Sequence, residues 1–366
     1  MAGLYIHIPF CHSKCAYCDF FSTPRSENSR LYVDTLIKEF NHRSNEVSEP
    51  ISSIYLGGGT PSSLPIDLLR QLIDALPLND VKEFTIEVNP EDVTDNLVNF
   101  IKSSPVNRVS MGVQTLNDSE LNFIGRRHSA EQAIKAYNCL RNDGISNISL
   151  DLIFGLPLQT LESWEDTLSR ILILSPEHLS AYTLMLEPGT RLYAMAAAGK
   201  FSPTDDSTIN TMYESLTKQL KINGYEHYEI SNFAKPGFKS IHNSSYWDFT
   251  PYIGLGTGAH SFDGTTRRYN PNNIKKYIES KGQITQFDSE TLTEKTNDYI
   301  MVRLRTTEGL SLSKLSDLFG LEASQEVMKS AQQFIANKQI IIHNNNLSIP
   351  PELFLISDSI ISALML

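Results

Sequence analysis

The feature that most constrains the fold is an alternation of short apolar segments with amphipathic segments of helical period, from residue 4 to about residue 187. Parallel strands need helical crossovers, so this pattern predicts an α/β fold with a parallel sheet covered by helices. The predicted strands are Leu4–Phe10, Ser53–Leu56, Glu83–Val88, Arg108–Val113, Ile148–Phe154 and His178–Met185. The predicted helices are about Arg30–Arg43, Ile66–Ala75, Asp95–Lys102, Glu131–Asp143 and Leu161–Leu174.

Six such units predict a partial (β/α)6 barrel of the TIM type over residues 1–187. In these barrels the chemistry lies at the carboxyl ends of the strands. Polar or glycine-rich segments occur at five of these strand ends: Cys11–Cys18, Gly57–Pro61, Glu87–Pro90, Gln114, and Asp151 just before the Gly-Leu-Pro turn. We therefore expect one site on this rim.

Two further regions are predicted after the barrel. Residues 188–290 contain a helix at Thr208–Asn223, short strands and glycine-rich turns, which predicts an α+β extension. Residues 291–366 predict a winged-helix-like domain. Its predicted elements are helices Leu312–Phe319 and Ala323–Asn337, a hairpin Ile340–Ile349 turning at Asn344–Asn346, and a helix near Ser357–Met365. Such modules often bind DNA, but this one ends in an apolar segment and lacks a strongly basic helix, which favours packing or partner contact.

Composition narrows the function classes. The net charge of −11 over 366 residues argues against nucleic-acid binding, since a phosphate backbone favours clustered Lys and Arg. No apolar stretch has the length of a membrane span, and the first residues predict a strand rather than a signal sequence. We expect a cytoplasmic protein, because a reducing compartment keeps cysteines available as thiolate ligands.

Three cysteines have the spacing Cys11-x3-Cys15-x2-Cys18. Three thiolates can bind three of the four irons of a 4Fe-4S cubane and leave one iron open. The open iron can chelate the amino and carboxylate groups of S-adenosylmethionine (SAM), and an electron from the cluster can split its carbon–sulfur bond to give a 5′-deoxyadenosyl radical. This triplet is the usual signature of radical SAM enzymes, and an aromatic residue before the last cysteine, here Tyr17, is also usual.

Other interpretations of the cysteines are a zinc site completed by His7 or His12, and thiols that pack as small apolar groups. Structural zinc sites normally join two closely spaced ligand pairs, and no second pair follows downstream. The fourth cysteine, Cys139, lies in a helical pattern, where we expect it to pack.

The rim residues offer groups that suit SAM. Peptide groups exposed in Gly57–Gly59 could bind the methionyl ammonium, and Glu87 could accept hydrogen bonds from ribose hydroxyls. Gln114, Arg126 and Asp151 could bind the remaining ribose and methionyl groups, with Arg126 pairing the carboxylate. Each has a structural alternative: a tight turn at the glycines, backbone contacts of the carboxylates, a helix cap by Gln114 and a solvated turn at Arg126.

Several ordered segments resemble the coproporphyrinogen dehydrogenase-like branch of radical SAM proteins. They are LYIHIPFCHSKCAYCDFFS, YLGGGTPS, FTIEVNPED, RVSMGVQTLND, IGRRH and DLIFGLP, and the resemblance runs through nearly the whole chain. It implies a 4Fe-4S cluster on Cys11, Cys15 and Cys18. The SAM-binding residues that it implies are Tyr5, Tyr17, Gly58, Gly59, Thr60, Glu87, Gln114, Arg126 and Asp151.

Two departures separate this chain from the dehydrogenases of that branch. The dehydrogenases extend the motif to Cys-x3-Cys-x2-Cys-x-Cys, whereas Phe20 stands at the fourth position in this chain. The dehydrogenases also carry an extension before the first strand, whereas the predicted first strand of this chain begins at Leu4. In both of these features the chain resembles the heme chaperone family instead. That resemblance implies delivery of heme to acceptor proteins, including respiratory membrane proteins, with a cellular electron donor, cluster-linked dimerisation and a peripheral position at the membrane. The alternative is oxidative decarboxylation of coproporphyrinogen III to protoporphyrinogen IX.

The segment HNSSYW resembles the HNxxYW heme motif of the chaperone family, which implies heme contacts by His242, Asn243, Tyr246 and Trp247. An imidazole can ligate heme iron, and aromatic rings can stack on a porphyrin. The alternative is core packing of a histidine beside two aromatic residues. His260 is a second candidate ligand, although the glycines before it indicate a turn.

Overall fold

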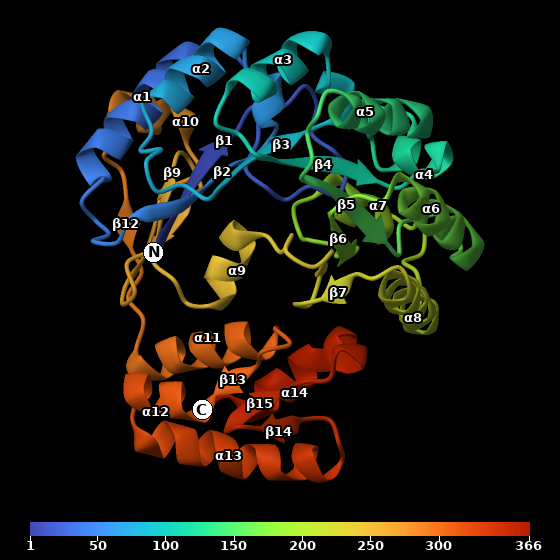
Figure 1. Ribbon diagram of the computed structural model, residues 1–366, viewed down its shortest axis with the longest axis vertical. Helices are drawn as coiled ribbons and strands as arrows, with labels where there is room; N and C mark the ends of the chain where they lie inside the picture. Colours follow the sequence, from blue (N-terminus) through green and yellow to red (C-terminus); the bar gives the residue numbers. More distant parts are fainter.

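The computed structural model describes residues 1–366 and contains a curved parallel sheet with helices on its convex face (Figure 1). Six strands pair in parallel in chain order, which confirms the predicted partial barrel. They are β1 Ala2–Ile8, β2 Ile51–Gly58, β3 Glu83–Val88, β4 Arg108–Gln114, β5 Ile148–Phe154 and β6 His178–Thr183. The covering helices are α1 Ser29–Arg43, α2 Ile66–Asp74, α3 Asp95–Ser103, α4 Asp118–Phe123, α5 Ala130–Asn142 and α6 Leu161–Leu174.

The first strand begins and ends two residues before its predicted bounds. Pro9 has no backbone N–H to donate to a ladder, and Phe10 makes only an isolated bridge with Thr23. The last barrel strand ends at Thr183, so Met185 belongs to the following loop. The loops that follow these two strands therefore each begin two residues earlier in the chain than predicted.

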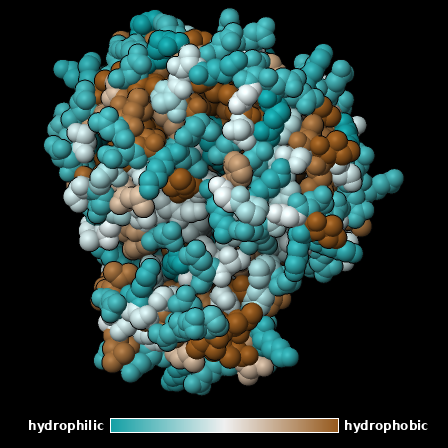
Figure 2. Space-filling model, viewed as in Figure 1, coloured by the Kyte–Doolittle hydropathy of each residue, from teal (hydrophilic) through white to brown (hydrophobic).

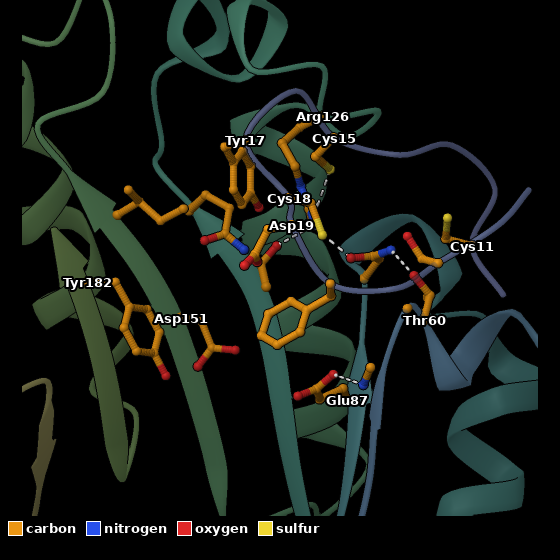
Figure 3. Close-up of a pocket in the computed structure, with 18 of the residues that line it drawn as sticks. Cys11, Cys15, Tyr17, Cys18, Asp19, Thr60, Glu87, Arg126, Asp151 and Tyr182 are labelled. Atoms are coloured by element: carbon orange, nitrogen blue, oxygen red, sulfur yellow. Dashed lines mark hydrogen bonds between the residues drawn. The ribbon is translucent and has the colours of Figure 1, made fainter. Parts of the chain in front are cut away.

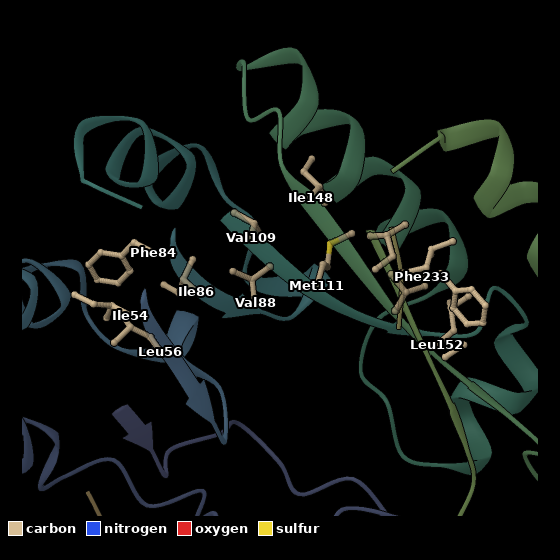
Figure 4. Packing of buried hydrophobic residues seen from close by; sticks show 14 of the residues in the cluster. Ile54, Leu56, Phe84, Ile86, Val88, Val109, Met111, Ile148, Leu152 and Phe233 are labelled. Carbon is tan, nitrogen blue, oxygen red and sulfur yellow. The ribbon is translucent and has the colours of Figure 1, made fainter. Parts of the chain in front are cut away.

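The two faces of the sheet differ in polarity because successive side chains of a strand point to opposite faces. Residues such as Ile54, Ile86 and Val109 are fully buried between the sheet and the outer helices, where Figure 4 shows them in one packed layer. The alternate residues face the inside of the curve and are mostly polar, such as Glu87 and Asp151. The sheet therefore has one core face and one polar face that can bind ligands.

The segment from 188 to 290 adds strands to both edges of this sheet, which has twelve strands in all. On one side β8 Asn232–Ala234 pairs antiparallel with β6, and β7 Glu226–His227 follows it. On the other side β9 Tyr252–Leu255 pairs in parallel with β1. The rest of this region comprises β10 His260–Phe262, β11 Arg267–Tyr269, β12 Gln286–Phe287, α7 Arg191–Ala197, α8 Asp206–Ile222, α9 Ile241–Trp247 and α10 Ile274–Glu279. The predicted α+β extension thus continues the barrel sheet, and the domain boundaries at 187 and 290 stay predictions.

Helix α9 lies inside the curve of the sheet, in the opening between its two edges (Figure 1). The buried carboxylate of Glu83, at the start of β3, accepts hydrogen bonds from the backbone N–H groups of Ile241 and His242 at 2.8 and 2.9 Å. It also accepts one from Ser240 Oγ at 3.1 Å. A carboxylate is favourable at a helix N-terminus, so Glu83 anchors α9 to the barrel.

The C-terminal lobe confirms the predicted winged-helix-like architecture, with a three-stranded sheet packed on helices. Its elements are α11 Leu292–Leu304, β13 Leu310–Ser311, α12 Leu312–Phe319, α13 Leu321–Ala336, β14 Ile341–His343, β15 Asn346–Ser348, η3 Pro351–Ile356 and α14 Ser357–Leu364. Asn344 and Asn345, in the predicted hairpin turn, have φ of 47° and 64°, the left-handed region that two-residue hairpin turns require.

The apolar last segment of the chain is mostly used inside the lobe. Ile360, Ile361 and Leu364 of α14 are buried in the core. Other apolar side chains of the lobe, such as Leu321 and Ile341, are exposed, and Figure 2 shows hydrophobic patches on its surface. None of the helices in the protein combines the length and apolar character that crossing a bilayer needs.

Candidate functional site

A cavity of about 520 Å³ opens at the carboxyl ends of β1 to β6 (Figure 3). It is the place where the rim of a β/α barrel gathers polar side chains from different strands. The structure brings most of the predicted residues to this cavity. Its lining includes Cys11, Cys15, Tyr17, Cys18, Gly58, Gly59, Thr60, Glu87, Gln114, Arg126 and Asp151, and also Asn243.

The cysteine loop is attached to the end of β1 by backbone and side-chain contacts. The N–H of Cys11 donates to Thr23 O at 3.1 Å, and the N–H of Thr23 donates to Pro9 O at 2.7 Å. Nε2 of the buried His7, on β1, binds Phe21 O at 2.8 Å. His7, named as a zinc ligand in one interpretation, is therefore used to close the loop.

The three thiols line one wall of the cavity, and no three His, Cys, Asp or Glu side chains lie close enough together to hold a single metal ion. In a cubane each thiolate binds a different iron, so the three thiols need not meet at one metal ion. Burial raises the pKa of Cys11, and it raises the pKa of Cys18 to about 11. Cluster binding would therefore release protons from these thiols. The donor set fits the predicted cluster.

Arg126 is predicted to pair the carboxylate of SAM, and in the structure its guanidinium holds the rim together. Nη2 donates to Asn89 Oδ1 at 2.7 Å and to Gly112 O at 2.5 Å, and Nη1 donates to Cys15 Sγ at 3.6 Å. Only the buried Nε has no partner. Arg126 thus links the cysteine loop to β4, and its pairing with SAM stays a prediction.

The glycine triplet lets β2 approach the end of β1 closely. Gly58 has φ of +110°, and a Cβ there would lie 2.6 Å from the ring of His7. A Cβ on Gly59 would lie 2.7 Å from Phe10 O. No side chain fits at either position, so the turn requires glycine. The N–H of Gly58 points to Glu87 Oε2 at 3.1 Å.

Glu87 and Asp151 place two carboxyl groups on the wall of the cavity (Figure 3). Burial raises the pKa of Glu87 to about 7; a hydrogen bond from Tyr55 opposes the shift, and the charge of Asp151 adds to it. Burial also raises the pKa of Asp151, whose two oxygens accept hydrogen bonds from Ser110 Oγ at 3.2 Å. Such carboxylates can accept hydrogen bonds from ligand hydroxyl and ammonium groups.

Tyr5 does not line the cavity, although the resemblance includes it among the SAM-binding residues. Its hydroxyl is hydrogen-bonded to His7 Nδ1 at 3.1 Å, beneath the cysteine loop. Tyr5 thus contacts the site through the histidine that closes the loop. Direct binding of SAM by Tyr5 stays a prediction.

The predicted heme residues lie on α9, and only Asn243 of the four reaches the cavity. The side chain of His242 is buried, with Nδ1 hydrogen-bonded to Ser53 Oγ at 3.0 Å and Nε2 to Tyr246 OH at 2.9 Å. Burial, and then the charge of Arg108, lower the pKa of His242 to about 3. Both ring nitrogens are occupied, so heme ligation requires at least one of these hydrogen bonds to break, and it stays a prediction.

The other predicted residues of this region are distributed as follows. The carbonyl oxygen of Trp247 accepts a hydrogen bond from Arg303 Nη1 at 3.2 Å, which ties the end of α9 to the C-terminal lobe. His260 is exposed on β10 and stacks on Tyr269. Cys139 is partly buried on α5 and packs against the core, as expected.

Sequence reasoning assigned no individual role to several residues of the cavity wall, namely Tyr55, Asn89, Ser110, Ser180 and Tyr182. Four of them lie on strands at alternate positions: Ser180 and Tyr182 are two residues apart, Tyr55 is two residues before Gly57, and Ser110 is four residues before Gln114. The signal was therefore the alternation of polar residues along each strand, which places every second side chain on the inner face. Asn89 follows β3 and fixes the rim by donating to Thr60 Oγ1 at 3.0 Å.

Comparison with family models and solved structures agrees with this architecture. Residues 5–171 match the model of the radical SAM superfamily, and residues 291–353 match that of the HemN C-terminal domain. The structure of coproporphyrinogen III oxidase (HemN) from Escherichia coli has the same fold. It superposes with a TM-score of 0.84 over 100% of this chain and 90% of that chain, at 23% identity.

Similar curated proteins span nearly the whole chain. The heme chaperone HemW of Bacillus subtilis is 36% identical, covering 94% of this chain and 93% of its own length. HemW of Escherichia coli is 36% identical over 84% of this chain and 83% of its own length. The mitochondrial radical S-adenosyl methionine domain-containing protein 1 of Danio rerio is 32% identical over 100% of this chain and 87% of its own length. With the cysteine triplet and the rim residues on the same barrel, these relatives show that the chain belongs to the HemW heme chaperone family of radical SAM proteins.

Proposed function

We propose that this protein is a heme chaperone that binds heme, one 4Fe-4S cluster and SAM and passes heme to acceptor proteins. The observation that carries the proposal is the 36% identity to the Bacillus subtilis heme chaperone over 94% of this chain. The second residue after the cysteine triplet supports it. Phe20 stands where the related dehydrogenases have a fourth cysteine, and its side chain lines the cavity.

Different residues of the cavity would bind the cluster and SAM. Cys11, Cys15 and Cys18 would each bind one iron, and Glu87 and Asp151 would accept hydrogen bonds from SAM. When bound, the cluster and SAM together supply an electron and a carbon–sulfur bond that this electron can split. The chain itself orients the ligands and keeps the thiols on one wall.

Heme binding by the α9 motif requires a local opening. His242 must give up its hydrogen bond to Ser53 or to Tyr246 before that ring nitrogen can ligate iron. The helix has seven residues, so the opening involves a short segment. We further propose acceptors that include respiratory membrane proteins, a cellular electron donor, a cluster-linked homodimer, and a cytoplasmic location with peripheral contact to the membrane.

Two parallel assays test the function. Anaerobically reconstituted protein is mixed with heme in one assay, and with coproporphyrinogen III, SAM and a reductant in the other, and absorption spectra and products are followed. The chaperone should give a stable heme spectrum in the first assay and no protoporphyrinogen in the second. Formation of protoporphyrinogen without heme binding would replace the proposal with the dehydrogenase.

Replacing Asp151 with alanine is expected to weaken SAM binding by roughly tenfold or more, because hydrogen bonds to charged groups contribute about 1.5–3 kcal/mol. Iron content should not change, since Asp151 bonds to Ser110 rather than to the cysteine loop. Equilibrium dialysis with labelled SAM measures the affinity. The exposed Asp166→Ala variant is the control. An unchanged affinity would assign Asp151 to the structure of the barrel alone.

The affinity for SAM is expected to fall about tenfold when the pH is lowered from 8 to 6. Glu87 has a pKa of about 7, so acidification converts its carboxylate into a neutral acid that accepts hydrogen bonds less well. Dissociation constants measured across this range should follow one titration with a midpoint near 7. Glu87→Gln should bind weakly at every pH and lose this midpoint. If the variant keeps the same pH profile, another group is titrating.

A further inference from the structure

Tyr55, on β2, lies between the predicted SAM site and the predicted heme motif. Its hydroxyl donates to Glu87 Oε1 at 2.8 Å, and its ring stacks on the ring of His242 with centroids 5.1 Å apart and planes 28° apart. Neither the cysteine motif nor the heme motif includes Tyr55. One side chain thus touches a residue of each site.

The ring of His242 is held firmly on its side of this contact. Its Nδ1 is bonded to Ser53, which lies two residues before Tyr55 and therefore on the same face of β2. Its Nε2 is bonded to Tyr246, one turn along α9. The backbone N–H of His242 is bound by Glu83. The imidazole cannot move without breaking a hydrogen bond, so it holds the stacked ring of Tyr55 in place.

The carboxylate of Glu87 lies on the other side of Tyr55 and has few hydrogen-bond partners. Its carboxylate accepts one hydrogen bond from Tyr55 and one from the N–H of Gly58. Burial raises the pKa of Glu87, and the bond from Tyr55 opposes this shift by stabilising the charged form. If Tyr55 moves, Glu87 loses half of its hydrogen bonds and part of the stabilisation of its charge.

We infer that His242 is a positioning residue of the SAM site, acting through Tyr55 on Glu87, and that heme ligation by His242 opposes SAM binding. The inference rests on the proposed function, which assigns SAM to Glu87 and heme to His242. An imidazole that turns to iron leaves the stack with Tyr55 and releases Glu87. Because coupling between two binding sites is reciprocal, SAM should weaken heme binding by the same factor.

The first arm of the test uses heme-free, cluster-loaded protein and measures the dissociation constant of SAM. Tyr55→Phe removes the hydroxyl but keeps the ring, and it should weaken SAM binding about tenfold. His242→Ala removes the stacking partner and should have a similar effect. His242→Phe restores a ring against Tyr55 and should recover most of the affinity, although it cannot ligate iron. Tyr225→Phe, which removes a buried hydroxyl bonded to Pro176 O, is the matched control.

The pH profile separates positioning from a loss of folding. In Tyr55→Phe the midpoint of the SAM profile should move upward from about 7, because the lost hydrogen bond stabilised the charged form of Glu87. A variant that is only less stable would keep the midpoint. Unchanged SAM affinity and midpoint in Tyr55→Phe, at full iron content, would overturn the inference even if His242→Ala fails to fold.

The second arm adds heme. In the wild type, saturating heme should raise the dissociation constant of SAM about tenfold, and in Tyr55→Phe it should leave the already weakened constant unchanged. If heme binds the wild type and SAM affinity does not change, the opposition between the two ligands is wrong. If heme does not bind at all, the proposed function fails, while the heme-free arm still decides the role of His242.

Discussion

Replacing Cys15 with alanine is expected to abolish the iron–sulfur cluster. Anaerobic reconstitution should give about four irons and four sulfides per wild-type chain and close to none in the variant. The three thiols come from one short loop, and the fourth cysteine lies on α5, outside the cavity. No spare thiolate can therefore replace the lost ligand. Iron and sulfide analysis, with the absorption spectrum of the cluster, measures the effect.

A second cysteine provides the control for this prediction. Cys139→Ala removes a partly buried thiol that packs on the core and should leave the iron content at the wild-type level. If Cys15→Ala keeps as much iron as wild type, or if zinc is the only metal that the wild type holds, the assignment of the cysteine triplet to a cluster is wrong.

Replacing His242 with alanine is expected to abolish the wild-type heme spectrum or to reduce heme transfer. The structure adds a second effect, because the same change removes a buried ring with two hydrogen bonds. The free energy of unfolding should fall by about 1–3 kcal/mol, as it commonly does for such core substitutions. Stability alone therefore does not distinguish a ligand from a core residue, and the heme spectrum decides.

His178 offers a matched control for this experiment. It is also fully buried, with its ring nitrogens bonded to Ser149 and Tyr228. His178→Ala should lose a similar amount of stability and keep the heme spectrum. If both variants lose stability and both keep the wild-type spectrum, His242 is a core residue and heme is held elsewhere.

The order of barrel strands and the position of the rim were predictable because they depend on local patterns. Each apolar segment and the helix after it are contiguous in the chain, and parallel pairing places all carboxyl ends on one edge. Residues that follow directly after a strand, such as the cysteine loop and Gly57–Pro61, therefore came together as expected. The alternation of polar residues on the inner face was also present in the sequence, and it identifies Tyr55 and Ser110.

The remaining features depend on contacts between distant parts of the chain. Strand β9 has four residues, too few for a periodic pattern, and it pairs with β1 almost 250 positions away. The place of α9 depends on Glu83, which precedes His242 by 159 positions. Arg126 has a guanidinium that suits a carboxylate, but in the structure this group already donates hydrogen bonds to three atoms of the rim. No local property of these residues indicates those partners.

The contact between Arg303 and the end of α9 makes the C-terminal lobe mechanically dependent on the barrel. Arg303, on α11, donates to the carbonyl oxygen of Trp247 and forms an ion pair with Asp248, the residue that ends the helix. A displacement of the lobe must break both contacts or pull the helix with it. A movement of the lobe therefore acts on the segment that carries His242, so the lobe and the predicted heme motif are mechanically connected.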